Sequence, residues 1–157
     1  MAKTVYIETS VPSAYVSHRS DPASLYRRAV TRLWWHEEAQ RYELTSSVAT
    51  LDELSRGNYP GRDEAIGLVE GLPLLELNEE VENVAELYIR HRLMPDEEAG
   101  DALHLAIASV HEVDYLLTWN IRHLANPNKV EHMTVINRRL GLMTPTILSP
   151  ETLWAEG

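Results

Sequence analysis

Residues 96–120, DEEAGDALHLAIASVHEVDYLLTWN, decide the fold of this chain. We expect a helix over residues 96–111, because the run ALHLAIASV is almost wholly apolar and predicts a helix that is buried around most of its circumference. A buried strand is expected at residues 115–118. Asp101 lies near the start of the helix, and Asn120 lies just beyond the strand. Since few polar side chains fall on these two elements, we infer that Asp101 and Asn120 line a functional site.

The length and composition of the chain predict one soluble domain spanning residues 1–157. Its 44% of hydrophobic and 24% of charged residues are ordinary for a globular protein. The absence of cysteine excludes disulfides, thiolate metal sites and a cysteine nucleophile, and it fits a reducing compartment. The N-terminal segment MAKTVYIETSVP predicts neither a signal peptide nor a membrane span. We therefore expect a cytoplasmic protein that is not bound to a membrane.

The charge balance limits how this chain can bind nucleic acid. The sequence has 14 Lys and Arg residues against 24 Asp and Glu residues, which gives a net charge of −10. The field of the whole molecule therefore repels a phosphate backbone. A nucleic-acid function has to rest on a local site with bound cations, and an acidic protein without such a partner fits the composition as well.

The rest of the sequence alternates between strand and helix patterns. Strands are also expected at residues 4–7, 42–45, 74–77 and 146–148, and helices at 23–40, 48–56, 62–70, 79–92 and 126–139. Asp21 and Asn78 are typical helix N-caps, and Ser46 and Ser47 are suited to the same role. A terminal helical turn is expected to start at residues 149–151. This alternation predicts an α/β fold whose central, mostly parallel sheet is covered by helices on both faces.

Acidic side chains are expected to converge at one edge of that sheet. Ligands of parallel α/β sheets bind beyond the carboxyl ends of the strands. Glu8 ends the first strand, and Asn120 would face the same crevice if the two strands were neighbours. Asp101 lies near a helix N-terminus, which begins at that edge, and Glu53 lies in a helix that starts just past the second strand. Three carboxylates and one amide therefore converge from four distant segments.

Gathering these carboxylates calls for a cation, because like charges raise each other's pKa. Oxygen ligands without cysteine select Mg²⁺ or Mn²⁺ over zinc. We predict that Glu8, Glu53 and Asp101 hold such a metal, on which a water molecule attacks a phosphodiester. Hydroxyl side chains beside these ligands are expected to orient waters or carboxylates, and they belong to Thr9, Ser10 and Thr118.

Plainer interpretations stand beside this one. Glu8 fits an ordinary exposed strand end equally well. Glu53 stands beside Asp52, and such a pair is typical of a solvated helix face. Asp101 is the hardest to explain in this way, because the helix that carries it looks buried. His104 follows Asp101 by three residues, and we expect a packing or hydrogen-bonding partner there rather than a catalytic base.

Other polar residues have simpler expected roles. Glu97 and Glu98 suit the first turn of a helix, where the helix dipole favours acids. The remaining histidines show no spacing typical of metal ligands, so we predict no histidine metal site. Arg122 and Lys129 are the candidate phosphate contacts, because they follow Asn120 closely in the sequence.

Four segments together resemble the signatures of the PIN domain family, in their usual order. They are the strand that ends in Glu8-Thr9-Ser10, the helix TLDELSRG with Glu53, GDALHLAIA with Asp101, and LLTWN ending at Asn120. The resemblance spans nearly the whole chain. It is closest to the branch related to the VapC toxins of bacterial and archaeal toxin–antitoxin pairs.

This resemblance implies a three-layer fold and a Mg²⁺- or Mn²⁺-dependent endoribonuclease that hydrolyses RNA. It implies the toxin of a type II toxin–antitoxin pair, with a small antitoxin protein as partner and frequent homodimers. The catalytic positions would be Glu8, Glu53, Asp101 and Asn120.

The chain departs from the family pattern at two of these positions. The first acid is usually Asp and here it is Glu8, and the fourth is usually Asp and here it is Asn120, which removes a charge. An alternative is therefore a PIN-like module that binds a protein or RNA without chemistry. A nucleotide- or small-molecule-binding fold has less support, because neither GxGxxG nor GxxxxGK[ST] occurs.

Overall fold

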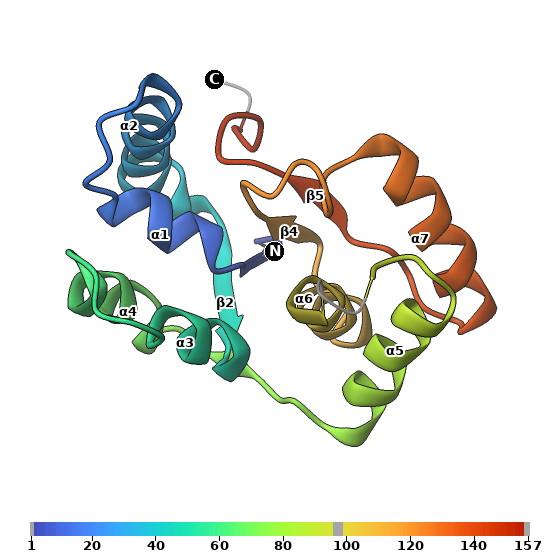
Figure 1. Cartoon of the computed structure of the whole chain (residues 1–157). Helices are drawn as coiled ribbons and strands as arrows, with labels where there is room; N and C mark the ends of the chain where they lie inside the picture. Colours follow the sequence, from blue (N-terminus) through green and yellow to red (C-terminus); the bar gives the residue numbers. More distant parts are fainter. Residues whose placement is uncertain (1, 96–98, 156–157) are drawn as a thin grey trace.

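A computed structural model describes residues 2–95 and 99–155 of the chain. The expectations for Glu97 and Glu98, and for a helix start at Asp96, lie outside the described residues. The strands form one five-stranded sheet in the order β3-β2-β1-β4-β5, and each neighbouring pair is parallel. Figure 1 shows the labelled strands between helices on either side. The α/β fold with helices on both faces of a parallel sheet is confirmed, as is the three-layer arrangement that the resemblance implies.

The elements follow the expected alternation closely. The strands are β1 (Thr4–Ile7), β2 (Glu43–Ser47), β3 (Leu74–Leu75), β4 (Tyr115–Leu117) and β5 (Thr146–Leu148). The helices are α1 (Ser10–Val16), α2 (Pro22–Glu37), α3 (Val48–Leu54), α4 (Arg62–Glu70), α5 (Glu79–Arg90), α6 (Ala99–Val110) and α7 (Pro127–Arg139), with a 3₁₀ turn at Ala39–Arg41. No helix within these described ranges has the length and apolar character that crossing a membrane requires.

Two of the expected helix caps are confirmed with a side-chain hydrogen bond, and Ser47 occupies the N-cap position of α3 without one. The Asp21 side chain accepts a hydrogen bond from the backbone of α2 at 3.1 Å, and Asn78 does the same for α5 at 2.9 Å. Ser46 and Ser47 do not cap α3 with their side chains. The Ser46 hydroxyl instead donates to the carbonyl of Ile7 at 2.8 Å, so it ties β2 to the end of β1. This hydroxyl therefore links two strands of the sheet and does not cap the helix.

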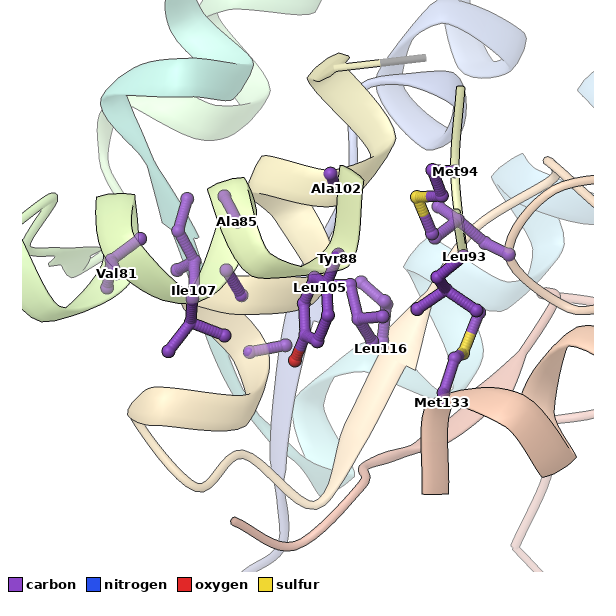
Figure 2. Close-up of a cluster of buried hydrophobic side chains, with 14 of the residues drawn as sticks. Val81, Ala85, Tyr88, Leu93, Met94, Ala102, Leu105, Ile107, Leu116 and Met133 are labelled. Carbon is purple, nitrogen blue, oxygen red and sulfur yellow. The ribbon is translucent and has the colours of Figure 1, made fainter. Parts of the chain in front are cut away.

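Successive residues of β1 face opposite layers of the protein, as the pleat of a strand requires. Tyr6 belongs to a core cluster with buried residues of α5, α6 and α7, whereas Ile7 belongs to a cluster with residues of α1 and α2. Figure 2 shows the first cluster, in which Tyr88 of α5, Leu105 of α6 and Met133 of α7 are drawn. As expected, α6 is buried around most of its circumference.

A set of buried polar side chains inside this core forms hydrogen bonds that join helices. The Tyr88 hydroxyl donates to Asn137 Oδ1 at 2.5 Å, and Asn137 Nδ2 donates to the hydroxyls of Ser109 and Thr144, each at 3.1 Å. Burial raises the pKa of Tyr88 to about 12, although its hydrogen bonds with Ser109 and Asn137 oppose that rise. These bonds link α5, α6 and α7 inside the core.

Candidate active site

Glu8 lies directly after β1, at the carboxyl edge of the sheet. Only 5% of the residue is exposed, so the interpretation as an ordinary exposed strand end is wrong. Its Oε1 accepts hydrogen bonds from Thr118 Oγ1 at 2.7 Å, from the Ser10 amide at 3.1 Å and from the Ser10 hydroxyl. Two of the three hydroxyls expected beside the ligands, those of Ser10 and Thr118, therefore hold Glu8. The pairing of β1 with β4, on which this convergence depended, is also present.

Asn120 and Asp101 contact each other at the same edge. Asn120 Nδ2 donates to Asp101 Oδ2 at 3.0 Å. The Asn120 amide oxygen accepts from the His123 backbone at 3.1 Å, and the Asn120 backbone donates to Thr118 Oγ1 at 2.9 Å. These contacts place the NH₂ group of Asn120, and not its oxygen, toward the carboxylate.

Glu53 reaches the edge from α3. Its Oε1 accepts from Thr9 Oγ1 at 2.7 Å and from the ring Nε2 of His104. Burial raises the pKa of Glu53, but the hydrogen bond and charge of His104, together with the hydrogen bond from Thr9, outweigh that effect and lower it. Asp52 beside it is exposed, so Glu53 alone of this pair turns toward the site.

His104 links Glu53 to the interior of the protein. The residue is only 1% exposed, and its Nδ1 lies 2.7 Å from the Tyr6 hydroxyl, which is hydrogen-bonded in turn to Ser47 at 2.7 Å. Burial lowers the pKa of His104. The neighbouring Tyr6, Glu53 and Glu8 together raise this pKa by more than burial lowers it, so the net shift is upward. The expectation that His104 is a hydrogen-bonding partner is confirmed, and the contribution of Tyr6 and Ser47 was missed.

Hydrogen bonds join Glu8, Asn120 and Asp101 at one edge, and Glu53 is linked to them through Thr9. Thr9, which holds Glu53, follows Glu8 in the chain, and Thr118 connects Glu8 to the Asn120 backbone. Within the described ranges, however, no three acidic or imidazole groups lie together in a way that would hold a metal ion. Each of these carboxylates has protein donors instead.

The chemistry of these donors fits a hard divalent cation. The hydrogen bonds given above reach one oxygen of each glutamate, Oε1 of Glu8 and Oε1 of Glu53. Carboxylate oxygens are the ligands that Mg²⁺ and Mn²⁺ take in proteins. Glu8, Glu53 and Asp101 are accordingly the side chains that would hold such an ion.

The basic residues near the edge differ in their surroundings. Lys129 donates to the carbonyl of Leu93 at 2.6 Å and so ties α7 to the segment after α5. Arg122 is exposed. Arg27 of α2 lies over the ring of Trp119, with 5.4 Å between the guanidinium carbon and the ring centre. The RNA-contact roles of Arg122 and Lys129 stay predictions.

Comparison with known proteins adds no relative. No family model matches the chain, and no curated protein matches it. The features that point to a function are therefore the residues of the edge itself, Glu8, Glu53, Asp101 and Asn120.

Proposed function

We propose that this chain is a Mg²⁺- or Mn²⁺-dependent endoribonuclease of the PIN type, acting in the cytoplasm as the toxin of a toxin–antitoxin pair. One observation carries the proposal. Acidic side chains from three separate segments lie along the carboxyl edge of a parallel sheet, and hydrogen bonds through Thr9, Ser10 and Thr118 hold two of them there. Ligand sites of parallel α/β sheets lie at this edge.

The residues of the edge have distinct roles in this proposal. Glu8, Glu53 and Asp101 hold the cation. When bound, a divalent cation lowers the pKa of a water molecule and stabilises the negative charge that develops on the phosphate. Asn120 orients Asp101 through the 3.0 Å hydrogen bond between its amide and the carboxylate. The acidic edge repels the phosphodiester until its charge is neutralised, so binding of the reacting phosphate at Glu8 and Asp101 is coupled to cation binding.

The first experiment measures cleavage of RNA by the purified protein with Mn²⁺ or Mg²⁺. The Asp101→Asn variant should lose cleavage, because it removes a charged ligand and keeps the shape of the side chain. Asp63→Asn is the matched control, since Asp63 is exposed on α4 and lies outside the hydrogen-bonded edge. Cleavage that survives both Asp101→Asn and EDTA comes from a contaminating nuclease and would overturn the assignment.

A second candidate is a PIN-like module that binds RNA or a protein without chemistry. Two contacts favour it: the Asn120 amide already occupies Asp101 Oδ2, and His104 already neutralises Glu53. Calorimetry distinguishes the two functions. The module should bind no Mn²⁺ and still bind its partner, whereas Mn²⁺ binding that is lost in Glu53→Gln supports the nuclease.

The proposal includes a homodimer and a small antitoxin partner. Apolar side chains on α2 support a protein interface, because Leu25, Tyr26 and Leu33 are exposed at 41%, 51% and 48%. Leu25 and Leu33 are eight residues apart and share one face of the helix. Sedimentation of the wild type and of Leu33→Glu tests the dimer. A small open reading frame directly upstream of the gene, whose product binds the purified chain, tests the antitoxin.

A further inference from the structure

A pocket of about 420 Å³ adjoins the acidic edge and has no role in the proposed function so far. Glu53 belongs to both, because it lines the pocket and also takes part in the hydrogen bonds of the edge. The other walls come from Ala49 at the start of α3, from Leu77 just beyond β3, and from Gly100 in the first turn of α6. All three follow the carboxyl ends of strands or begin helices there, so the pocket opens at the same edge as the acids.

The lining of the pocket combines an apolar surface with a charged rim. Ala49, Leu77 and Leu103 line it, and each also packs in the main hydrophobic core. The core therefore fixes this surface in advance of any ligand. Asp52 and Arg56 are exposed lining residues of α3 and of the segment just after it. The charge of Arg56 helps to lower the pKa of Glu53, so its guanidinium lies near this end of the acidic edge. Among the described residues Arg56 forms no salt bridge, which leaves its guanidinium able to contact an anion as well.

We propose that this pocket binds one nucleotide of the RNA strand, next to the phosphodiester that lies at Glu8 and Asp101. The base would lie against the Leu77 and Leu103 surface, and Arg56 would contact a phosphate. The inference rests on the proposed nuclease function and adds to it a site that selects the flanking nucleotide. Arginine is well suited to phosphate recognition, and single-stranded RNA offers unstacked bases to apolar surfaces.

The position of the pocket along the sheet matches a strand that crosses the edge. The pocket lies beyond β3 and β2, Glu8 lies beyond β1, and Asn120 lies beyond β4, in the order of the sheet. Neighbouring strands are about 4.8 Å apart, so the span from β3 to β4 is about 14 Å. An extended RNA segment lying across the strand ends would place one nucleotide in the pocket and an adjacent phosphate at the acids. The volume is also within the range of about 300–1,000 Å³ typical of small-ligand pockets.

Gly100 leaves space between the wall of the pocket and the carboxylate of Glu53. A Cβ atom at this position would lie 3.2 Å from Glu53 Oε2, which is closer than most such contacts. The absence of a side chain therefore leaves the second oxygen of Glu53 accessible from the pocket. Glu53, one of the proposed cation ligands, lines the pocket, so a nucleotide bound there would adjoin the acidic edge through Glu53.

Binding of mononucleotides tests the pocket without relying on catalysis. The four nucleoside 5′-monophosphates and inorganic phosphate are titrated into the full chain in EDTA, with NMR chemical shifts as the readout. We expect at least one nucleotide to bind, with shifts at Leu77 and Leu103, and inorganic phosphate to bind much more weakly. Equal affinity for phosphate and for all nucleotides would mean that Arg56 is only an anion site, and this would overturn the proposal.

Two variants with matched controls locate the binding. Ala99 is exposed and lines the pocket, so Ala99→Leu fills it from the surface and should weaken nucleotide binding about tenfold or more. Ala29→Leu, on the exposed side of α2, should leave it unchanged. Arg56→Gln should weaken nucleotide binding, whereas Arg138→Gln, exposed on α7, should not. Thermal melting verifies that all four variants fold.

Mapping of cleavage sites in a randomised RNA separates this inference from the nuclease itself. The wild type should prefer particular bases at one position beside the cleaved bond, and Ala99→Leu should flatten that preference. If wild type and Ala99→Leu cut with the same preference and bind nucleotides equally, the pocket is overturned while the nuclease stands. If nucleotides bind in the pocket but the wild type cuts no RNA, the nuclease fails and the binding site stands.

Discussion

The side-chain amide of Asn120 donates a hydrogen bond to the carboxylate of Asp101, with 3.0 Å between Nδ2 and Oδ2. In Asn120→Asp a carboxylate would stand in place of this donor. Without metal, the variant should be less stable, because it loses a hydrogen bond worth about 0.5–1.5 kcal/mol and gains a repulsion between like charges. Mn²⁺ should raise its melting temperature more than that of the wild type.

Asn126→Asp is the control for this comparison. The Asn126 side chain caps α7 by accepting from the Asn128 backbone at 3.0 Å, a role that Asp fills equally well. Its melting temperature should therefore respond to Mn²⁺ as that of the wild type does. A smaller Mn²⁺ response in Asn120→Asp than in the wild type would contradict the placement of a cation beside Asp101.

The pair formed by Glu53 and His104 should make stability depend on pH. The pKa of His104 is raised above its ordinary value of 6.5, so its contribution is complete below that value and is lost as the pH rises through the folded pKa. The pKa of Glu53 is lowered from 4.5, so its contribution is present above that value and is lost as the pH falls through the folded pKa. The pair should therefore stabilise most between these two ordinary values.

Urea unfolding of the wild type and of His104→Gln measures this contribution. The variant should lose free energy of unfolding at mildly acidic pH, and the loss should shrink as the pH is raised above about 6.5. His132→Gln, at an exposed position on α7, controls for the removal of a histidine. A loss that stays constant from about pH 5 to about pH 9 would show that His104 contributes only packing.

Thr118→Val tests how Glu8 is held. The substitution keeps the shape of the buried side chain and removes the hydroxyl that donates to Glu8 at 2.7 Å and accepts from the Asn120 backbone at 2.9 Å. Leaving buried partners without a hydrogen bond costs about 1–3 kcal/mol, and Mn²⁺ affinity should fall as well. Thr134→Val removes a hydroxyl that donates within α7 at 2.8 Å, and it should leave Mn²⁺ affinity unchanged.

Tyr88→Phe should affect stability without affecting the acidic edge. It removes the hydroxyl that donates to Asn137 at 2.5 Å in the core, at a cost of about 1–3 kcal/mol in the free energy of unfolding. Tyr26→Phe is the matched control, because Tyr26 is exposed. Cation affinity should be the same in both variants. A large change in Tyr88→Phe alone would mean that the core network reaches the site.

Local patterns predicted the positions of the acids well, because each depends on one strand or helix and its end. Glu8 follows from the end of β1, and Asp101 follows from the start of an apolar helix. The helix α1 was missed, since SVPSAYV is only seven residues long, contains Pro12 and shows no clear periodicity. Pro is tolerated in a first helical turn, and packing of residues such as Val11 against the neighbouring helices stabilises the segment.

The partners of the acids were harder to predict than the acids. Tyr6 lies in an apolar strand and looks like an ordinary core residue, and its link to His104 joins positions 98 residues apart. Such a contact depends on how β1 and α6 pack, which neither segment determines alone. The pairing of His104 with Glu53 and the donation from Asn120 to Asp101 have the same origin. The sequence therefore predicts which segments meet, and the packing decides which atoms bond.

The burial of His104 beneath Glu53 affects how the protein would bind the proposed cation. A histidine that carries a proton here acts as a counter-ion supplied by the protein itself, so part of the acidic edge is already balanced before any metal arrives. Folding and metal loading are then separate events, unlike in small metal-dependent domains, where the ion is needed for folding. Under the proposed nuclease function, a cell short of divalent ions would accumulate this chain in a folded, dormant form that the return of the ion would activate.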